Sequence, residues 1–434
     1  MTDIQKQIEN LSPAKRELLL QRLKQKKKEI LSVENFPDLK AEAVLEPAIR
    51  PDPLSFNFIN EPSSIFLTGA TGFLGAFLFH ALLEQTQADI YCLVRSENPE
   101  FCQIKLQKNF EYYGIWQEQY RGRIIPVRGD LSQPLLGLDE QKFQKLACEI
   151  DIIYHSGALL HYTYPYPQFK PVNVLGTQEV LRLASTVKVK PVHYVSTIAV
   201  FESAVYSEKI VTELDRLEHS DQMYLGYSQS KWVAEKLVKI AGERGLPISI
   251  YRPPLISGHS QTGVWNTDDI FCRIIKGCIQ MESWPDLDII WDMSSVDYVS
   301  QSIVYLSREK ESLGKAFHLN NPQPIHWNQF FDWIQNFGYP LQKISLKNWQ
   351  TQLEHIDSEN PLYPLVPFFL TRRYDKQLTG VEMYEEARRP KVSCSKTLAA
   401  LAGSSITCPP IDDKLLRTYF SDFIQSGFLK SPVI

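Results

Sequence analysis

A tyrosine and a lysine stand four residues apart in the stretch LGYSQSKWVAEKLV, at Tyr227 and Lys231. On a helix, this spacing puts both side chains on one face. An ammonium group beside a phenol favours the ionised phenol, so the pair suits a tyrosine that transfers protons near neutral pH. Thr197 adds a hydroxyl just after the apolar run PVHYV. These three residues form a candidate catalytic group.

A glycine-rich loop lies far upstream, in FLTGATGFLG. Its three glycines, spaced three apart, follow an apolar run and open a helix-like stretch. The first two would let the backbone turn sharply and approach a pyrophosphate at the positive end of the helix, and the third would let helix and strand pack closely. The sequence therefore predicts a dinucleotide site. Its predicted contacts in this loop are Gly69, Thr71, Gly72, Phe73, Leu74 and Gly75.

The next apolar run ends in CLVRS, which places Arg95 where an NAD-preferring protein carries an acidic residue for the ribose hydroxyls. A guanidinium pairs with a 2′-phosphate in two-point geometry, whereas a carboxylate would repel it. Arg95 therefore predicts NADPH as the cofactor.

Strand-like apolar runs alternate with amphipathic helices from Ile65 to about Pro254, which indicates an α/β fold with a doubly wound parallel sheet of Rossmann type. After Gly258 the rhythm breaks, and strands are expected only in SSVDYVSQSIVYLS and KAFHLN. The predicted domains are an N-terminal helix and linker (1–60), a cofactor-binding domain (61–320, with 259–290 contributing to the substrate side) and a smaller, mainly helical substrate-binding or lid domain (321–434).

The composition of the 434 residues is that of an ordinary globular protein, and a net charge of −4 gives no reason to expect nucleic acid as a partner. Seven scattered cysteines, without C-x-x-C spacing, suggest neither a disulfide scaffold nor a metal site. No apolar run is long enough for a membrane span, and no signal peptide is recognisable. The expected location is the cytoplasm.

The first 30 residues carry eight Lys or Arg and four Asp or Glu. Within them, Ser12 and Pro13 indicate the start of a helix. Two interpretations stay open: a frayed, solvated helix, or a helix that docks on a partner protein. The proline-rich stretch that follows, up to about Asn60, is typical of a linker that runs over the surface.

The ordered motifs G-x-x-G-x-x-G, Arg after the second strand, GDL, S-T and Y-x-x-x-K together resemble the extended short-chain dehydrogenase/reductase superfamily, over 65–319. The resemblance implies that Thr197, Tyr227 and Lys231 are the catalytic triad, and that Tyr227 and Lys231 also contact the cofactor. It implies further cofactor contacts from Asp130 and Leu131 at the adenine, from Gly157 and Ala158 in the trough, and from Lys105, Asn173, Pro253 and Ile256.

Several stretches look like one subgroup, the terminal thioester reductase domains of nonribosomal peptide and polyketide synthetases and of carboxylic acid reductases. They include PVNVLGTQEVLRLAS, PVHYVSTIAVF and YRPPLISGHSQTG. Three details depart from the subgroup pattern: Lys105 stands where arginine is common, Pro254 where glycine is frequent, and Ser294-Ser295 where a proline-containing turn is expected.

This resemblance implies that NADPH reduces an acyl or peptidyl thioester, held on the phosphopantetheine arm of a carrier protein, to an aldehyde, or to an alcohol after a second hydride transfer. Three alternatives stay open: a fatty acyl-CoA reductase, a sugar-nucleotide epimerase or dehydratase, and a non-catalytic NADPH sensor. His155 and His161 are interpreted as structural, and the aromatic stretches after residue 325 as core and lid packing.

Overall fold

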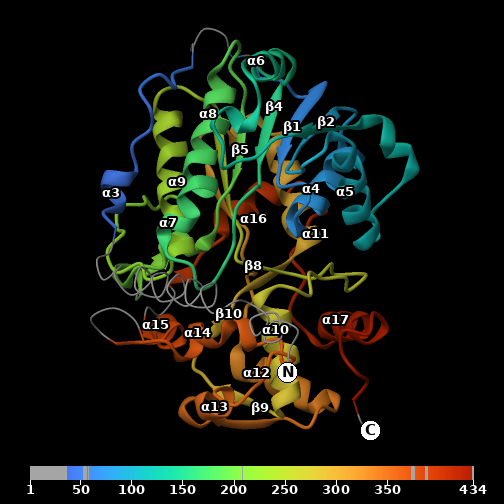
Figure 1. Cartoon of the computed structure of the whole chain (residues 1–434), viewed down its shortest axis with the longest axis vertical. Coiled ribbons are helices and arrows are strands. Elements are labelled where there is room, and N and C mark those ends of the chain that lie inside the picture. The colour runs from blue at the N-terminus through green and yellow to red at the C-terminus, as the bar shows by residue number, and fades with distance from the viewer. Residues whose placement is uncertain are drawn as a thin grey trace, which may run out of the picture.

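The computed structural model describes residues 37–51, 56, 58–207, 209–372, 377–386 and 390–432. The predicted basic helix and its docking role fall within the first 36 residues and so lie outside the described residues. Figure 1 shows a sheet flanked by helices on both sides, with a helix-rich part beyond one end of its strands.

The central sheet has seven strands, all parallel, in the order β12-β7-β5-β4-β1-β2-β3. The chain winds outward from β1 in one direction and then from β4 in the other, so the strand order reverses between these two neighbours. Such a reversal leaves a crevice at the carboxyl ends of the two strands. The strands are β1 (Ser64–Thr68), β2 (Asp89–Val94), β3 (Ile124–Arg128), β4 (Ile152–His155), β5 (Val192–Val195), β7 (Ile248–Arg252) and β12 (Ala316–His318).

Each face of the sheet carries its own apolar core, because successive side chains of a strand point to opposite faces. In β1, Phe66 belongs to one core, while Ile65 and Leu67 belong to the other. The first core is closed by α6 (Glu140–Glu149), α7 (Tyr166–Phe169), α8 (Gly176–Ser185) and α9 (Gly226–Glu243), and the second by α4 (Phe73–Gln85), α5 (Pro99–Tyr112), α11 (Val296–Ser307) and α16 (Ser395–Leu401). This architecture confirms the predicted doubly wound fold.

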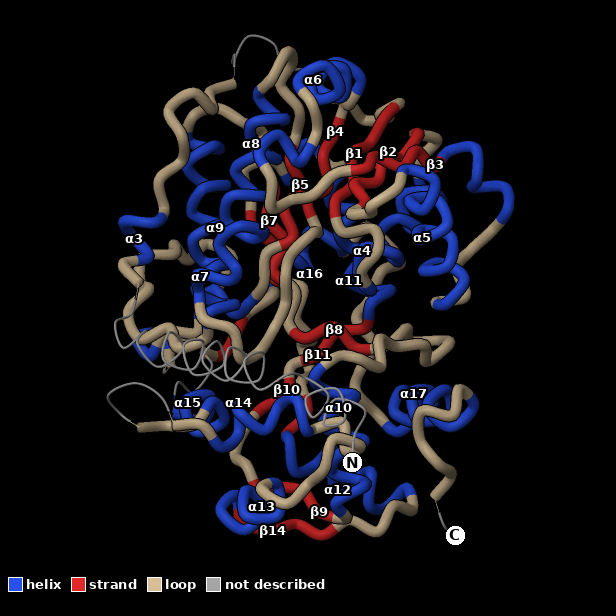
Figure 2. The backbone as a smooth tube through the Cα atoms, in the orientation of Figure 1, coloured by secondary structure: helices blue, strands red, loops and turns tan. Residues whose placement is uncertain are grey.

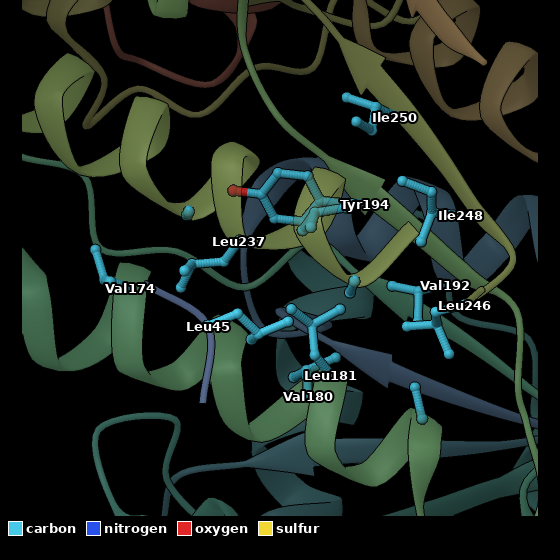
Figure 3. Packing of buried hydrophobic residues seen from close by; sticks show 14 of the residues in the cluster. Leu45, Val174, Val180, Leu181, Val192, Tyr194, Leu237, Leu246, Ile248 and Ile250 are labelled. Atoms are coloured by element: carbon cyan, nitrogen blue, oxygen red, sulfur yellow. The ribbon is translucent and has the colours of Figure 1, made fainter. Parts of the chain in front are cut away.

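The segment 38–50, which contains α3 (Leu39–Glu42), was predicted as part of a surface linker. It does cross the surface of the first core, but Leu45 is buried there, and Figure 3 shows it with Leu181 and Leu237. The guanidinium of Arg244, which directly follows α9, donates hydrogen bonds of 2.7–3.0 Å to backbone carbonyls of this segment. The segment is therefore fixed to the surface of the first core by a buried leucine and by hydrogen bonds from Arg244.

The stretch SSVDYVSQSIVYLS, predicted as a strand, is the helix α11 preceded by the short strand β11 (Met293–Ser295). Val296, Val299 and Ile303 recur at helical spacing and pack in the same core as α4. β-branched residues favour strands only weakly, and this tertiary contact decides the structure.

The helix-rich part has a third apolar core, which receives helices and short strands from residue 265 onward. Figure 2 shows β8 (Leu255–Ser257) and β11 between this part and the main sheet. The other elements of this part are α10 (Ile270–Met281), β9 (Ser283–Asp286), β10 (Ile290–Trp291), β13 (Ile325–His326), α12 (Trp327–Phe337), β14 (Gln342–Ser345), α13 (Leu346–Leu353), α14 (Val366–Leu370), α15 (Gly380–Glu386) and α17 (Asp413–Gln425).

The predicted C-terminal domain, 321–434, is not one piece. β15 (Lys391–Val392) pairs with β6 (Ile210–Val211), and Leu401 of α16 is buried in the second core of the main sheet. The chain therefore returns to the sheet before α17 rejoins the helix-rich part. The helix α10 lies within 259–290, the stretch expected to contribute to the substrate side, and its apolar face does pack in the third core of the helix-rich part.

Candidate active site

A cavity of about 610 Å³ lies at the carboxyl edge of the main sheet, between the sheet and the helix-rich part. Residues that directly follow six of the seven strands contribute to its wall. They are Gly69 after β1, Arg95 after β2, Gly129 after β3, Ser156 and Gly157 after β4, Ser196 and Thr197 after β5, and Pro253 after β7. The fold therefore brings residues from distant parts of the sequence to one edge.

The glycine loop occupies the crevice between β1 and β4. Gly69 has a φ of +84°, and a Cβ placed on it would lie 2.7 Å from the backbone nitrogen of Gly157. A Cβ on Gly75, in the first turn of α4, would lie 1.9 Å from the Gly69 carbonyl oxygen. No side chain caps this helix, so N–H groups of its first turn stay available to an anion at the cavity wall. These features fit a bound pyrophosphate.

Arg95 and Lys105 both line the cavity and are exposed, and the Lys105 Nζ donates to the Arg95 carbonyl at 3.2 Å. Two cations at this edge fit a ribose phosphate. Nearby, the Asp130 carboxylate accepts 2.8 Å hydrogen bonds from the backbone nitrogen and the hydroxyl of Ser132, which fixes the turn that carries Leu131.

All but one of the predicted site residues line this cavity. The exception, Asn173, is buried with its side chain on the Leu159 backbone: Oδ1 accepts from the Leu159 nitrogen at 2.7 Å, and Nδ2 donates to the Leu159 carbonyl at 3.0 Å. The direct contact of Asn173 with the cofactor stays a prediction. Asn173 holds the wall segment that Leu159 belongs to.

Tyr227 and Lys231 lie on the first turns of α9 and both line the cavity, together with Thr197. Lys231 is buried, and its Nζ donates a 2.8 Å hydrogen bond to the Val195 carbonyl at the end of β5. The same Nζ lies 4.4 Å from the centre of the Tyr194 ring. These contacts tie α9 to the strand that carries Thr197.

The charges around Tyr227 differ from the sequence-based expectation. Burial raises the pKa of Tyr227 above its ordinary range, the nearby Glu202 carboxylate adds to this rise, and the Thr197 hydroxyl acts against it. Burial lowers the pKa of Lys231 to about 7, and Glu235 opposes this shift. Burial and Glu202 therefore favour the protonated phenol of Tyr227, the form that can donate a hydrogen bond.

Sequence reasoning missed two groups in the cavity wall. Glu202 follows Thr197 by five residues and accepts a 2.5 Å hydrogen bond from the Ser228 hydroxyl, next to Tyr227. The second group is aromatic and comes from the stretches that were interpreted as packing. Part of each stretch does pack in the third core, but Trp327, Phe368 and Phe369 also face the cavity. Only the richness in aromatic residues signalled them in the sequence.

The two histidines differ in position. The ring of His155 is buried between the hydroxyls of Thr68, at 2.7 Å, and Thr177, at 3.0 Å, and burial lowers its pKa to about 3. His161 lines the cavity and stacks on Tyr164 with ring centroids 3.5 Å apart.

The described ranges hold no group of three or more His, Cys, Asp or Glu residues placed to bind a metal ion. Nor does any helix in them combine the length and apolar character that crossing a membrane requires.

Residues 67–303 match a family model of NAD-binding domains described as Male sterility protein. The structure is similar to the terminal R domain from the myxalamid PKS-NRPS biosynthetic pathway, with a TM-score of 0.84 and 42% identity over 91% of this chain and 99% of that one. This chain belongs to the reductase (R) domains of the Male sterility protein family. The predicted resemblance to extended short-chain dehydrogenase/reductases and to synthetase reductase domains is thereby confirmed.

Curated relatives of this R domain include much longer proteins. A linear gramicidin synthase of Brevibacillus parabrevis is 38% identical over 398 residues, which are 90% of this chain and 8% of that protein. L-2-aminoadipate reductase of Schizosaccharomyces pombe is 34% identical over 400 residues, 87% of this chain and 27% of that protein. The chain therefore corresponds to a small part of each of these relatives.

Proposed function

We propose that this R domain is a cytoplasmic enzyme that uses NADPH to reduce an acyl or peptidyl thioester on a carrier protein to an aldehyde. The observation that carries the proposal is the meeting of Thr197, Tyr227 and Lys231 in the cavity that also contains the glycine loop. The 42% identity to a terminal R domain supports it.

The cofactor would lie along the wall formed by the strand ends. Its pyrophosphate fits the glycine loop at the start of α4, and Arg95 and Lys105 suit the 2′-phosphate that distinguishes NADPH from NADH. Lys231, fixed by its bond to the Val195 carbonyl, would hold the nicotinamide ribose. When bound, the cofactor supplies the hydride.

The hydroxyls of Thr197 and Tyr227 would donate hydrogen bonds to the thioester carbonyl oxygen. As the carbonyl carbon becomes tetrahedral, negative charge gathers on this oxygen, and preorganised donors stabilise it most in the transition state. The raised pKa of Tyr227 keeps its donating proton in place. Collapse of this oxyanion then breaks the carbon–sulfur bond and leaves the aldehyde, and the pantetheine sulfur departs as a thiolate that takes up a proton from water.

Arg95 separates this proposal from the epimerase and dehydratase alternative. Enzymes of that kind keep their cofactor bound and tend to carry an acidic residue where Arg95 stands. The presence of both Tyr227 and Lys231 speaks against the non-catalytic sensor. A fatty acyl-CoA reductase shares this chemistry and differs only in the thiol that carries the acyl group.

The deciding experiment mixes the purified chain with NADPH and one acyl group presented in three ways: on a phosphopantetheinylated carrier protein, on pantetheine alone, and on coenzyme A. We expect loss of the NADPH absorbance and appearance of the aldehyde, fastest with the carrier. Faster reduction of acyl-CoA would favour the fatty acyl-CoA reductase, and no oxidation with any of the three would rule out the reductase.

A further inference from the structure

The cavity extends from Tyr227 into the helix-rich part, and this extension is lined by aromatic and aliphatic side chains. We call it the aromatic arm. It is defined by Phe271 and Ile274 of α10, Trp291 of β10, Trp327 of α12, and Phe368 and Phe369 of α14.

The rings of the aromatic arm pack against one another. The Trp291 ring packs edge to face on Phe271, with centroids 4.1 Å apart, and on Trp327 at 4.6 Å. The indole nitrogen of Trp327 donates a 2.8 Å hydrogen bond to the Pro285 carbonyl, so its polar atom is satisfied within the protein. A wall that is already packed gains contacts with an apolar ligand at little ordering cost.

Charged groups are scarce along the aromatic arm. Among the described residues of the cavity wall, Asp269 is the charged group that lies at the arm, directly before α10. Its carboxylate is engaged as the cap of that helix: one oxygen accepts from the Cys272 nitrogen at 2.8 Å, and the other from the Trp265 indole at 2.5 Å. An anionic chain entering the arm would lose its water and find no partner of opposite sign, and the one carboxylate that a cationic chain could meet is already engaged as the helix cap.

We propose that the acyl group reduced beside Tyr227 ends in an uncharged apolar chain, aliphatic or aromatic, that occupies the aromatic arm. This inference rests on the proposed thioester reduction and names its substrate class. Each methylene buried in such an arm should tighten binding about fourfold until the arm is filled.

The test compares three acyl chains on pantetheine: acetyl, octanoyl, and an octanoyl chain that ends in a carboxylate. Binding is measured by calorimetry with the amide analogues, which cannot be reduced, and turnover with the thioesters and NADPH. We expect octanoyl to bind at least about a hundredfold more tightly than acetyl, and the terminal carboxylate to remove most of that gain. Equal binding of octanoyl and acetyl, or of the two long chains, would overturn the inference.

Binding of the amides separates this inference from the proposed function. Tight octanoyl binding without turnover of any thioester would contradict the reductase and leave the apolar arm supported. Turnover of all three thioesters with equal kcat/KM would support the reductase and contradict the apolar arm.

Two substitutions on α10 test whether the acyl chain lies in the aromatic arm. Ile274→Phe fills the aromatic arm and should reduce the ratio of octanoyl to acetyl affinity at least about tenfold, while the wall stays apolar. Ile279→Phe, on α10 but outside the cavity wall, should keep that ratio. An unchanged ratio in Ile274→Phe, with the fold intact by circular dichroism, would place the acyl chain elsewhere and overturn the inference.

Discussion

The hydroxyl of Ser196 donates a 2.6 Å hydrogen bond to the carboxylate of Glu235. Ser196 directly precedes the catalytic candidate Thr197, and Glu235 lies on α9 one turn beyond Lys231. The same carboxylate forms a fully buried ion pair with Arg252 of β7, at 2.6 Å. This buried network therefore connects the residues after β5, which include Thr197, to α9, which carries Tyr227, and to β7 of the sheet.

Replacement of Glu235 by Gln should destabilise the protein by about 3–5 kcal/mol, because it leaves the Arg252 guanidinium buried without a counter-charge. Denaturant unfolding measures this loss. The matched control is Lys239→Gln, since Lys239 contacts the same carboxylate at 3.4 Å but is partly exposed. A loss in Glu235→Gln no larger than in this control would mean that Arg252 finds another partner.

The unfolding free energy should fall as the pH drops from about 6.5 towards 3. Burial lowers the pKa values of His155, His193 and His318 to about 3, so the unfolded chain binds these protons first. Burial alone would raise the pKa of Glu235, but Arg252 and its neighbours lower it to about 2, so its stabilisation is lost between about pH 4.5 and 2. Both effects lower the unfolding free energy as the pH falls. Urea unfolding at a series of pH values should show this decline, and a flat profile from pH 6.5 to 4 would contradict it.

The parts of the site that sequence analysis predicted are those set by local spacing. The glycine loop, Arg95 at a strand end, and the four-residue step from Tyr227 to Lys231 each depend on a few neighbouring residues and on one element. Because parallel strands end at one edge of the sheet, the alternation of strands and helices was enough to predict that these pieces meet.

The parts that sequence analysis did not predict depend on contacts between distant segments. Asn173 was assigned to the cofactor from its motif, but only the folded chain shows that its amide bonds to the Leu159 backbone. Similarly, an aromatic residue such as Phe368 packs in a core and borders a cavity at once, and composition does not separate these roles. The raised pKa of Tyr227 likewise comes from burial and from Glu202, which the Y-x-x-x-K motif does not show.

Tyr227→Phe should reduce kcat about a hundred- to thousandfold, since it removes one donor to the developing oxyanion. NADPH binding, followed by cofactor fluorescence, should change little. Tyr363→Phe, at a tyrosine that is 51% exposed and outside the cavity wall, is the matched control. Turnover of Tyr227→Phe within about threefold of the parent would remove this tyrosine from the mechanism.

Arg95→Asp should weaken NADPH binding about tenfold to a hundredfold and improve NADH binding, because a carboxylate repels the 2′-phosphate and suits the free ribose hydroxyls. The measurement is the ratio of the two dissociation constants. Arg121→Asp, at an exposed arginine outside the cavity wall, controls for the change in net charge. If the ratio stays that of the parent, Lys105 is the next residue to test, because its Nζ bonds to the Arg95 backbone.

Gly75→Ala tests whether the cofactor loop depends on close approach between helix and strand end. The added methyl would lie 1.9 Å from the Gly69 carbonyl oxygen, so either the loop or α4 must move. We expect a loss of stability of about 1–3 kcal/mol and weaker NADPH binding, because Gly69 in turn packs against Gly157 in the crevice between β1 and β4. Gly122→Ala is the matched control, since its added methyl meets nothing within 4 Å and should change stability by less than about 0.5 kcal/mol. If Gly75→Ala binds NADPH as tightly as the control, the pyrophosphate does not depend on this packing, and the first turn of α4 alone would have to hold it.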